Sequence, residues 1–491
     1  MAILLGIDLG TSSVKAMLVN SDTSRVLACE NVSYDVSIPS LGRAEQSPQM
    51  WYAALIEVFG KLRESEPDSF ASIASIAISG QMHGLVITGD DDECVSPAII
   101  WLDQRSKPQI DEIYQKVSFE EMRDVFKNRV SVGFAFPSLL WVRENEPETF
   151  ARAKHIMMPA DYIRLKLTGV CACDASNASS STIFDIEKRD WAWDIIDRFG
   201  LDRDLFPPVG ESCDAAGEVC ARAAGETGLR AGTPVVFGAG DQPCYSLGIG
   251  VIGEGALSTS IGTGGQLAAY SDGALCDKWL RTHTFCHAVK SGYTVFGATL
   301  SAGLSLNWLR HRIIHADSYK AMDEMAKTVP AGCEGLIYLP YLTGERTPYM
   351  NPDCRAMFLG LTLGMDDRYM TRAVMEGVVF SLRDCLAIIN DMGLDSDTIV
   401  AAGTGAVSGV WLQMQADILS RRVITCAGVE RAAVGACIIA GVGAGAYSTY
   451  EEACRALVSY SQVEYLPNPD NRGVYDDAYE RYRKAYRDNF R

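Results

Sequence analysis

Short apolar runs separated by small-residue turns open the chain, and this pattern predicts a β-meander. Residues 3–9 are apolar up to an acidic position near their end, a turn of Gly, Thr and Ser follows at 10–13, and a second apolar run covers 14–19. Residues 25–36 alternate between apolar and polar side chains, as a half-buried third strand does. We therefore expect three consecutive strands at the N-terminus.

A helix and two further strands are expected next. Residues 48–64 begin with Pro and carry apolar side chains at helical spacing. The apolar runs 73–79 and 85–88 predict strands, and the sequence Gly-Gln-Met-His-Gly at 80–84 lies between them. Strands that alternate with helices are typical of an α/β fold.

The second half of the chain repeats the opening pattern. Residues 257–261 and 266–270 predict two strands, joined by the turn Gly-Thr-Gly-Gly at 262–265. This turn and the first one share an aliphatic-Gly-Thr sequence and lie about half a chain length apart. The repetition predicts two halves of common architecture that face one another.

Composition shifts predict where these halves meet. The glycine-rich stretch around residue 250 gives an N-terminal domain over 1–248 and a second domain over 249–450. The Ala- and Gly-rich residues 432–447 predict a buried helix, because they are too short and too weakly apolar for a membrane span. The charged, Tyr-rich residues 451–491 predict a helical segment packed on the body.

Composition and charge narrow the class of protein. The chain has 491 residues, of which 48% are hydrophobic and 22% charged, as in a soluble globular protein. Its net charge of −18 argues against a nucleic-acid or anionic-membrane binder. The N-terminus has no basic targeting segment, and the 15 scattered cysteines contain no paired CxxC. We expect a cytoplasmic protein, and we expect the HTFCH sequence at 283–287 to be a core or substrate-side segment, not a metal site.

Asp8 and the turn after it are the first candidate site. The small residues of the turn can direct backbone N–H groups and hydroxyls at phosphate oxygens, and Asp8 can hold Mg²⁺. The alternative is an ordinary hairpin turn. The second turn, at 262–265, favours the phosphate interpretation, because two facing hairpins could hold a triphosphate from both sides.

Asp241 is the candidate general base. It follows the apolar run 234–237 and the small residues Gly-Ala-Gly, so it lies at the mouth of a buried strand. Phosphoryl transfer needs such a carboxylate to accept the proton of the attacking hydroxyl. The alternative is a cap for a helix that begins near Pro243. Residues 402–406, Ala-Gly-Thr-Gly-Ala, could let a purine approach the backbone or could serve close helix–sheet packing.

Taken in order, these segments resemble the FGGY family of carbohydrate kinases, within the superfamily of actin, Hsp70 and hexokinase. The matching segments are GIDLGTSSVK (6–15), SGQMHG (79–84), AIIWLDQRS (98–106), GAGDQ (238–242), YLPYLTGERTPYMNP (338–352), FLGLT (358–362) and RAVMEG (372–377). The resemblance implies an α/β fold of two actin-like (ribonuclease H-like) domains that face each other across a catalytic cleft. GQMHG, GERTP and TFCHA (284–288) are most similar to the subgroup that phosphorylates D-xylulose.

The resemblance also implies residue roles, with ATP, Mg²⁺ and a sugar as the small-molecule partners. It makes Asp241 the base and Asp8 the carboxylate associated with Mg²⁺. Sugar-side positions are Gln81, Met82, His83, Asp103, Arg105 and Gln242. Nucleotide-side positions are Gly10, Thr11, Ser12, Ser13, Gly262, Thr263, Gly403, Gly405 and Ala406. No nucleic-acid or membrane partner is expected, and a homodimer is left open.

Three departures from the subgroup affect substrate identity or nucleotide affinity. Gln242 stands where Asn is usual, Leu102 replaces the Asn of a Trp-Asn-Asp sequence, and Thr404 interrupts the glycines of the adenosine motif. The alternatives are a kinase for ribulose, another ketose, a polyol or gluconate, and a nucleotide-dependent sugar-binding regulator without catalysis.

Overall fold

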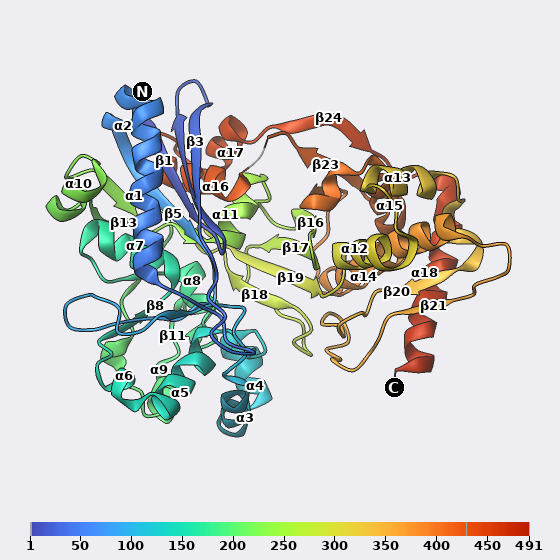
Figure 1. Ribbon diagram of the computed structural model, residues 1–491, viewed down its shortest axis with the longest axis horizontal. Helices are drawn as coiled ribbons and strands as arrows, with labels where there is room; N and C mark the ends of the chain where they lie inside the picture. The colour runs from blue at the N-terminus through green and yellow to red at the C-terminus, as the bar shows by residue number, and fades with distance from the viewer. Residues whose placement is uncertain (1, 429, 491) are drawn as a thin grey trace.

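The computed structural model describes residues 2–428 and 430–490 and has two lobes, each built on a large mixed β-sheet (Figure 1). The sheet of the first lobe has the strand order β13-β14-β5-β1-β2-β3, and β15 pairs with the end of β5. Its strands are β1 Ile3–Leu9, β2 Ser13–Asn20, β3 Arg25–Ser33, β5 Ile73–Gly80, β13 Ala215–Glu218, β14 Pro234–Val236 and β15 Ala239–Gly240.

The sheet of the second lobe has the order β18-β19-β17-β16-β22-β23-β24. Its strands are β16 Leu257–Ile261, β17 Gly265–Ser271, β18 His283–Cys286, β19 Tyr293–Thr299, β22 Thr398–Ala402, β23 Arg422–Cys426 and β24 Tyr460–Tyr465. Short paired strands lie outside both sheets: β4 Glu45–Gln46, β6 Val86–Thr88, β7 Ala98–Ile99, β8 His155–Met157, β9 Cys173–Asp174, β10 Phe184–Asp185, β11 Asp190–Trp191, β12 Val209–Gly210, β20 Ile337–Leu339 and β21 Met357–Leu359.

Helices cover both sheets. In the first half of the chain they are α1 Pro48–Ser65, α2 Pro67–Ala71, α3 Lys107–Lys116, α4 Phe119–Glu121, α5 Ala135–Asn145, α6 Pro147–Ala151, α7 Pro159–Thr168, α8 Ala175–Ser179, α9 Trp193–Arg198, α10 Ala221–Thr227 and α11 Asp241–Gly248. In the second half they are α12 Gly303–Trp308, α13 Tyr319–Lys327, α14 Asp367–Asp391, α15 Gly409–Leu419, α16 Arg431–Gly443, α17 Tyr450–Leu457 and α18 Pro469–Asn489. Single turns of 3₁₀ or π type are η1 Met122–Phe126, η2 Arg203–Leu205, η3 Leu309–Ile314, η4 Ala331–Gly335 and η5 Thr404–Val407.

The two sheets share one topology, which confirms the predicted duplication. Within the described residues, the path β13-β14-β5-β1-β2-β3 corresponds strand by strand to β24-β23-β22-β16-β17-β19. In each path the first pair is antiparallel, the next two pairs are parallel, and the last two are antiparallel. The predicted hairpins β1–β2 and β16–β17 therefore occupy equivalent places in the two lobes.

Three details differ from the sequence expectations. The third strand ends at Ser33 and not at residue 36, and the helix expected near Pro243 already begins at Asp241. The segment 451–491, expected to be helical, also contains β24, which pairs with β23 at the edge of the second sheet. Its mostly exposed, polar side chains conceal the strand in the sequence.

Helix α16 joins the two halves of the chain, because it comes from the second half and packs on the first sheet. Its core cluster includes Leu4 of β1, Ala77 of β5 and Cys244 of α11 (Figure 1). Glycines make the close approach possible: a Cβ at Gly435 would lie 1.8 Å from the carbonyl oxygen of Cys244, and one at Gly6 would lie 2.4 Å from that of Ala433. No helix in the described part of the chain has the length and apolar character that a membrane span needs.

We expect Gly435→Ala to destabilise the protein. The added methyl group overlaps the backbone of α11, and such overpacking costs roughly 1–3 kcal/mol or more, against a gain of about 1 kcal/mol from helix propensity. Gly225→Ala in α10 is the matched control, because a Cβ there meets no atom within 4 Å. Urea unfolding should show a lower free energy of unfolding for Gly435→Ala and an equal or higher one for Gly225→Ala. Equal stability of the two variants would contradict this packing.

Candidate active site

Asp8 and Asp241 lie together because three neighbouring strands end side by side. In the first sheet, Asp8 of β1 is in register with Ser79 of β5, and Ser79 is in register with Ala239 of β15. Asp241 begins α11 directly after β15. The Ser79 hydroxyl donates a hydrogen bond to Asp8 Oδ1 at 2.9 Å. The predicted metal carboxylate and the predicted base thus share one edge of the sheet.

Burial raises the pKa of both carboxyl groups. Burial, and then the negative charge of Asp8, raise the pKa of Asp241 to about 7. Burial also raises the pKa of Asp8, while the Ser79 hydroxyl and the Lys15 ammonium lower it. A carboxyl with a pKa near neutrality can accept a proton in one step and release it in the next, as a general base must.

His83 is oriented by its backbone and by one hydrogen bond. Its φ is +70°, and its Nδ1 lies 3.0 Å from the carbonyl oxygen of Ser180, so Nδ1 carries the proton and donates. The ring stacks on Phe134 at 4.1 Å, and burial lowers its pKa to about 4. His83 is therefore neutral at physiological pH, and Nε2 presents a lone pair that can accept a hydrogen bond.

Met82 packs beside Asp241, and Gln81 forms a hydrogen bond with the first predicted phosphate turn. A Cβ at Gly240 would lie 2.6 Å from Met82 Cγ, so Met82 packs directly on the residue before Asp241. Gln81 accepts a hydrogen bond from the Thr11 hydroxyl at 3.3 Å and donates one to Gln46 Oε1 at 2.9 Å. Both ends of the Gln81 side-chain amide thus have partners in the protein, and one of them is Thr11 of the first predicted phosphate turn.

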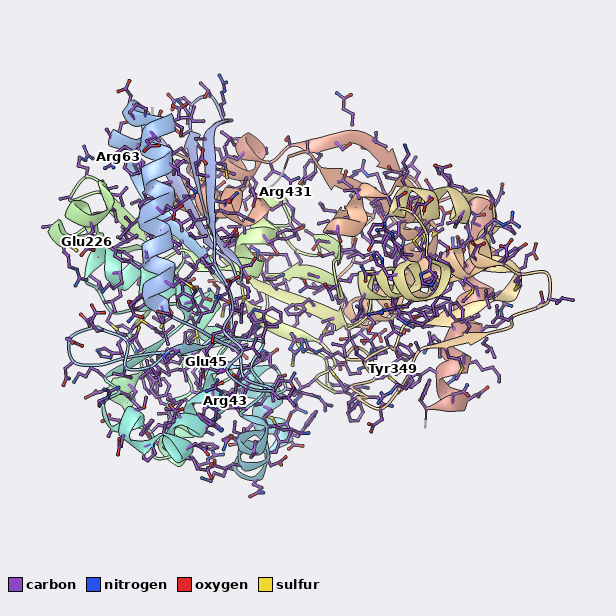
Figure 2. All side chains as sticks on the ribbon, in the orientation of Figure 1. Arg43, Glu45, Arg63, Glu226, Tyr349 and Arg431 are labelled. Carbon is purple, nitrogen blue, oxygen red and sulfur yellow. The ribbon has the colours of Figure 1, made fainter. Side chains whose placement is uncertain are left out.

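Asp103 and Arg105 form an ion cluster. Asp103 is fully buried and accepts hydrogen bonds from the Ala44 N–H at 2.7 Å and from the Arg105 guanidinium at 2.8–3.0 Å. Arg105 also pairs with Glu45 at 2.5 Å, and Figure 2 labels Glu45 close to Arg43 in the first lobe. These partners fix both side chains within the first lobe, and their expected place on the sugar side stays a prediction.

Gln242 and Leu102, the departures on the sugar side, have different surroundings. The Gln242 amide nitrogen lies 3.4 Å from Ser246 Oγ, one turn along α11, and its Oε1 is buried without a hydrogen-bond partner among the described residues. Leu102 is 42% exposed. The expectation that Gln242 contacts the sugar stays a prediction.

The predicted nucleotide segments of the second lobe pack on one another. Gly403 has φ +77°, and a Cβ there would lie 2.6 Å from the carbonyl oxygen of Ile261, the residue before the Gly262 turn. A Cβ at Gly405 would lie 2.7 Å from Ile261 Cβ, and the Thr404 hydroxyl donates to Ile261 O at 3.2 Å. Thr404 thus fixes the loop to the end of β16 instead of blocking it.

The two turns expected to hold phosphates each expose one hydroxyl-bearing residue. Ser12 and Thr263 are exposed at the tips of their turns. The first hairpin is closed by the Gly10 N–H, which donates to Ser13 O at 2.9 Å, and the second by the Gly262 N–H. The Thr11 hydroxyl accepts a hydrogen bond from Trp101 Nε1 at 3.0 Å, so it already has a partner within the first lobe.

Several residues of the site were missed by sequence reasoning. Lys15 lies opposite Asp8 in the β1–β2 register and pairs with Glu430 at 2.5 Å. Counting outward from the turn would have found it, because paired positions in a hairpin are symmetric about the loop. Tyr245 of α11 packs against a cluster that contains Val400 of β22, so it links α11 to the second lobe, and no local pattern signals this contact.

The HTFCH segment is part of the packing between the lobes. His283 to Cys286 form β18, an edge strand of the second sheet, and Phe285 and Cys286 belong to the hydrophobic core of the first lobe. His283 Nδ1 lies 3.2 Å from Asn128 Oδ1. Over residues 2–428 and 430–490, no group of His, Cys, Asp and Glu side chains is arranged to hold a metal ion.

Comparison with known proteins identifies the family. The model of the N-terminal domain of the FGGY family of carbohydrate kinases matches residues 3–248, and that of the C-terminal domain matches residues 257–444. The chain belongs to the FGGY family of carbohydrate kinases. It is an ATP-dependent sugar kinase with the two-domain, actin-like kinase fold, as the sequence segments indicated.

The individual relatives match over nearly the whole chain. It is 34% identical to xylulose kinase of Bacillus subtilis (strain 168), over 99% of this chain and 97% of the relative. It is 35% identical to xylulose kinase of Lactococcus lactis subsp. lactis (strain IL1403), again over 99% and 97%. The crystal structure of a xyloylose kinase from Brucella ovis superposes with a TM-score of 0.94 at 33% identity, over 99% of both chains.

The raised pKa of Asp241 predicts a pH-dependent stability cost. The pKa of Asp241 is about 7 in the folded state, against an ordinary value of 3.8, so the native state keeps this proton up to a higher pH than the unfolded state does. Stability is therefore lost as pH rises from about 4 to about 7. Asp241→Asn removes this cost, which amounts to up to about 4 kcal/mol above pH 7. Thermal melts should show a higher Tm for Asp241→Asn at pH 8 and little change at pH 4.

Asp477→Asn, at an exposed position of α18, serves as the control and should leave Tm unchanged at both pH values. If Asp241→Asn melted at the wild-type temperature at pH 8, Asp241 would carry no such ionisation cost.

Proposed function

We propose that this kinase transfers the γ-phosphate of ATP to a hydroxyl of D-xylulose and forms D-xylulose 5-phosphate. The observation that carries the chemistry is the pairing of Asp241, with its pKa near 7, and Asp8 at one sheet edge. The full-length similarity to xylulose kinases supports the choice of sugar.

In the proposed reaction Asp241 accepts the proton of the attacking sugar hydroxyl. The hydroxyl oxygen then bonds to the γ-phosphorus as the bond from that phosphorus to the bridging oxygen of ADP breaks. The proton on Asp241 passes to solvent after the sugar phosphate leaves. Because the side chain starts at a helix N-terminus that is fixed on the sheet, its carboxylate needs little reorganisation.

The residues present fit a Mg²⁺ ion. Asp8 Oδ1 accepts from Ser79, whereas Oδ2 accepts no hydrogen bond from the described residues and is available as a hard oxygen ligand. A cation at Asp8 would offset the repulsion between the two carboxylates. When bound together with ATP, Mg²⁺ supplies positive charge that stabilises the phosphate oxygens.

On the sugar side, neutral His83 accepts a hydrogen bond from a sugar hydroxyl through Nε2, with the ring held by Phe134 and Ser180. On the nucleotide side, the Gly262 turn holds phosphates and the Gly403 loop holds the adenosine. Because His83 belongs to the first lobe and both nucleotide segments belong to the second, the substrates bind in a cleft between the lobes.

A coupled ADP-release assay over ketoses, polyols and sugar acids tests the substrate, and we expect the highest kcat/KM for D-xylulose. In the same assay Asp241→Asn should lower kcat about 10²–10⁴-fold, the usual contribution of a general base. Its Kd for sugar and ATP should stay within about threefold, because the carboxamide is isosteric. A higher kcat/KM for gluconate would refute the sugar, and near-wild-type turnover of Asp241→Asn would refute the base.

Asp8→Ala should lower activity by weakening the use of Mg²⁺. Removing the oxygen ligand raises the Mg²⁺ concentration needed for half-maximal rate, with little change in the sugar KM. A Mg²⁺ titration at saturating ATP and sugar measures this shift. Ser12→Ala, which removes an exposed hydroxyl from the turn that follows Asp8, is the comparison. An unchanged Mg²⁺ requirement with a raised sugar KM would remove Asp8 from the metal site.

A further inference from the structure

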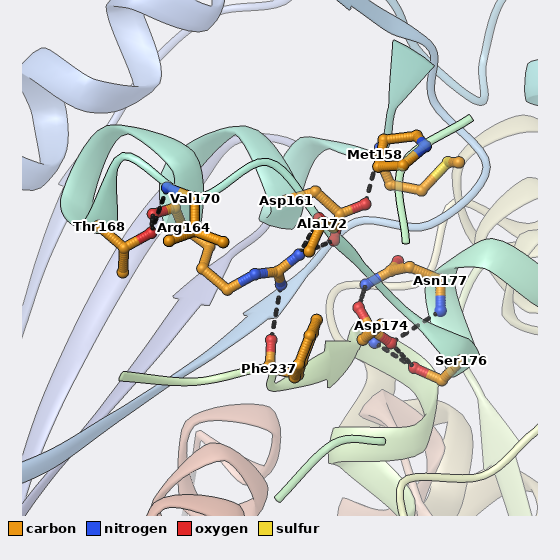
Figure 3. Close-up of polar contacts among 12 residues, drawn as sticks. Met158, Asp161, Arg164, Thr168, Val170, Ala172, Asp174, Ser176, Asn177 and Phe237 are labelled. Atoms are coloured by element: carbon orange, nitrogen blue, oxygen red, sulfur yellow. Dashed lines mark hydrogen bonds and ion pairs between the residues drawn. The ribbon is translucent and has the colours of Figure 1, made fainter. Parts of the chain in front are cut away.

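A buried polar network holds the turn that precedes Asp241 (Figure 3). At the start of the turn, Arg164 of α7 is fully buried and donates from Nη1 to the carbonyl oxygen of Phe237 at 2.8 Å. Its Nη2 donates to Asp161 Oδ1 at 2.6 Å and to the carbonyl oxygen of Ala172. The guanidinium also lies over the Phe237 ring, 4.9 Å from its centre. The peptide at Phe237 is thus fixed from α7.

At the end of the turn, the contact comes from α8. The Gly240 N–H donates to Ser176 Oγ at 2.9 Å, and the Ser176 hydroxyl donates to Asp174 Oδ1 at 2.5 Å. Asp174 also accepts from the backbone and side-chain nitrogens of Asn177 at 2.9 and 2.6 Å. Asp174 and Ser176 are fully buried. Because the Ser176 hydroxyl donates its hydrogen bond to the Asp174 carboxylate, an oxygen lone pair of Ser176 is directed at the Gly240 N–H.

Between these contacts the turn has little freedom. Gly238 has φ +77°, and a Cβ there would lie 2.0 Å from the carbonyl oxygen of Ile78. Gly240 lies against Met82, so no larger residue fits. Asp241 is the next residue, and its position therefore follows that of the Gly240 peptide.

We propose that Ser176, oriented by Asp174, is a positioning residue for Asp241. The proposal rests on the proposed function, because it assigns Ser176 no contact with substrate and lets it act only through the base. Without the serine oxygen, the buried Gly240 N–H has lost its acceptor, and the first turn of α11 can shift. A displacement of about 1 Å can lower a rate about a hundredfold when the reacting groups need tight geometry.

The test is Ser176→Ala measured against Ser181→Ala. Ser181 is equally buried, and among the described residues its hydroxyl forms hydrogen bonds only with the backbone of its neighbours Ala178 and Ile183. We expect Ser176→Ala to lower kcat about 10–100-fold with both KM values within about threefold, and Ser181→Ala to match wild type. Ser176→Cys, which keeps a weak acceptor of similar shape, should fall between them, and it carries the test if Ser176→Ala does not fold.

A double variant separates positioning from general loss of structure. In the Asp241→Asn background, Ser176→Ala should lower the residual kcat no further, because the group that it positions is already absent. An equal further loss in that background, or wild-type kcat for both Ser176→Ala and Ser176→Cys, would overturn the inference. Unchanged kcat for Asp241→Asn alone would instead refute the proposed base, so the two failures are distinguishable.

Discussion

The structure depends on holding two carboxylates close together at a buried sheet edge, where burial opposes the ionisation of both and the charge of Asp8 opposes that of Asp241. Asp8 is fixed by β1 and Asp241 by β15 and α11, with β5 between them. Burial raises the pKa of both groups, and the negative charge of Asp8 raises that of Asp241 further. Such an arrangement persists only where the surrounding packing determines it, because moving either strand end would relieve the charge.

That packing comes from the other half of the chain. Helix α16 lies on β1 and α11 through glycines that allow backbone contact, so residues near 435 support a carboxylate at position 241. Tyr245 of α11 in turn packs against a cluster that contains Val400 of β22, in the second lobe. The helix that begins with the proposed base therefore contacts both lobes.

The sequence was informative where the physics is local. Apolar runs predicted the strands β1 and β5, the repeated strand-turn-strand pattern predicted β16, and the acidic residues at strand mouths were correctly placed as neighbours of small-residue turns. β24 was missed because an exposed edge strand carries polar side chains on most positions, which removes the alternating pattern. The partners of Asp103 and Ser176 were also missed, since Ala44 and Gly240 come from distant parts of the sequence.

Hydrogen-bond capacity separates the supporting residues of the site from those free to bind ligands. The polar groups of Asp103, Arg105 and Gln81 are bound by protein atoms, so a ligand would have to displace an existing partner. His83 Nε2 and Asp8 Oδ2 have unused hydrogen-bond capacity among the described residues, and they are the atoms assigned to the sugar and to Mg²⁺ in the proposed reaction. Among the described residues the buried acceptor of Gln242 has no hydrogen-bond partner, and a shorter Asn at that position would place this acceptor differently. The same type of residue can thus be scaffold or site, and the partners it has already found decide which.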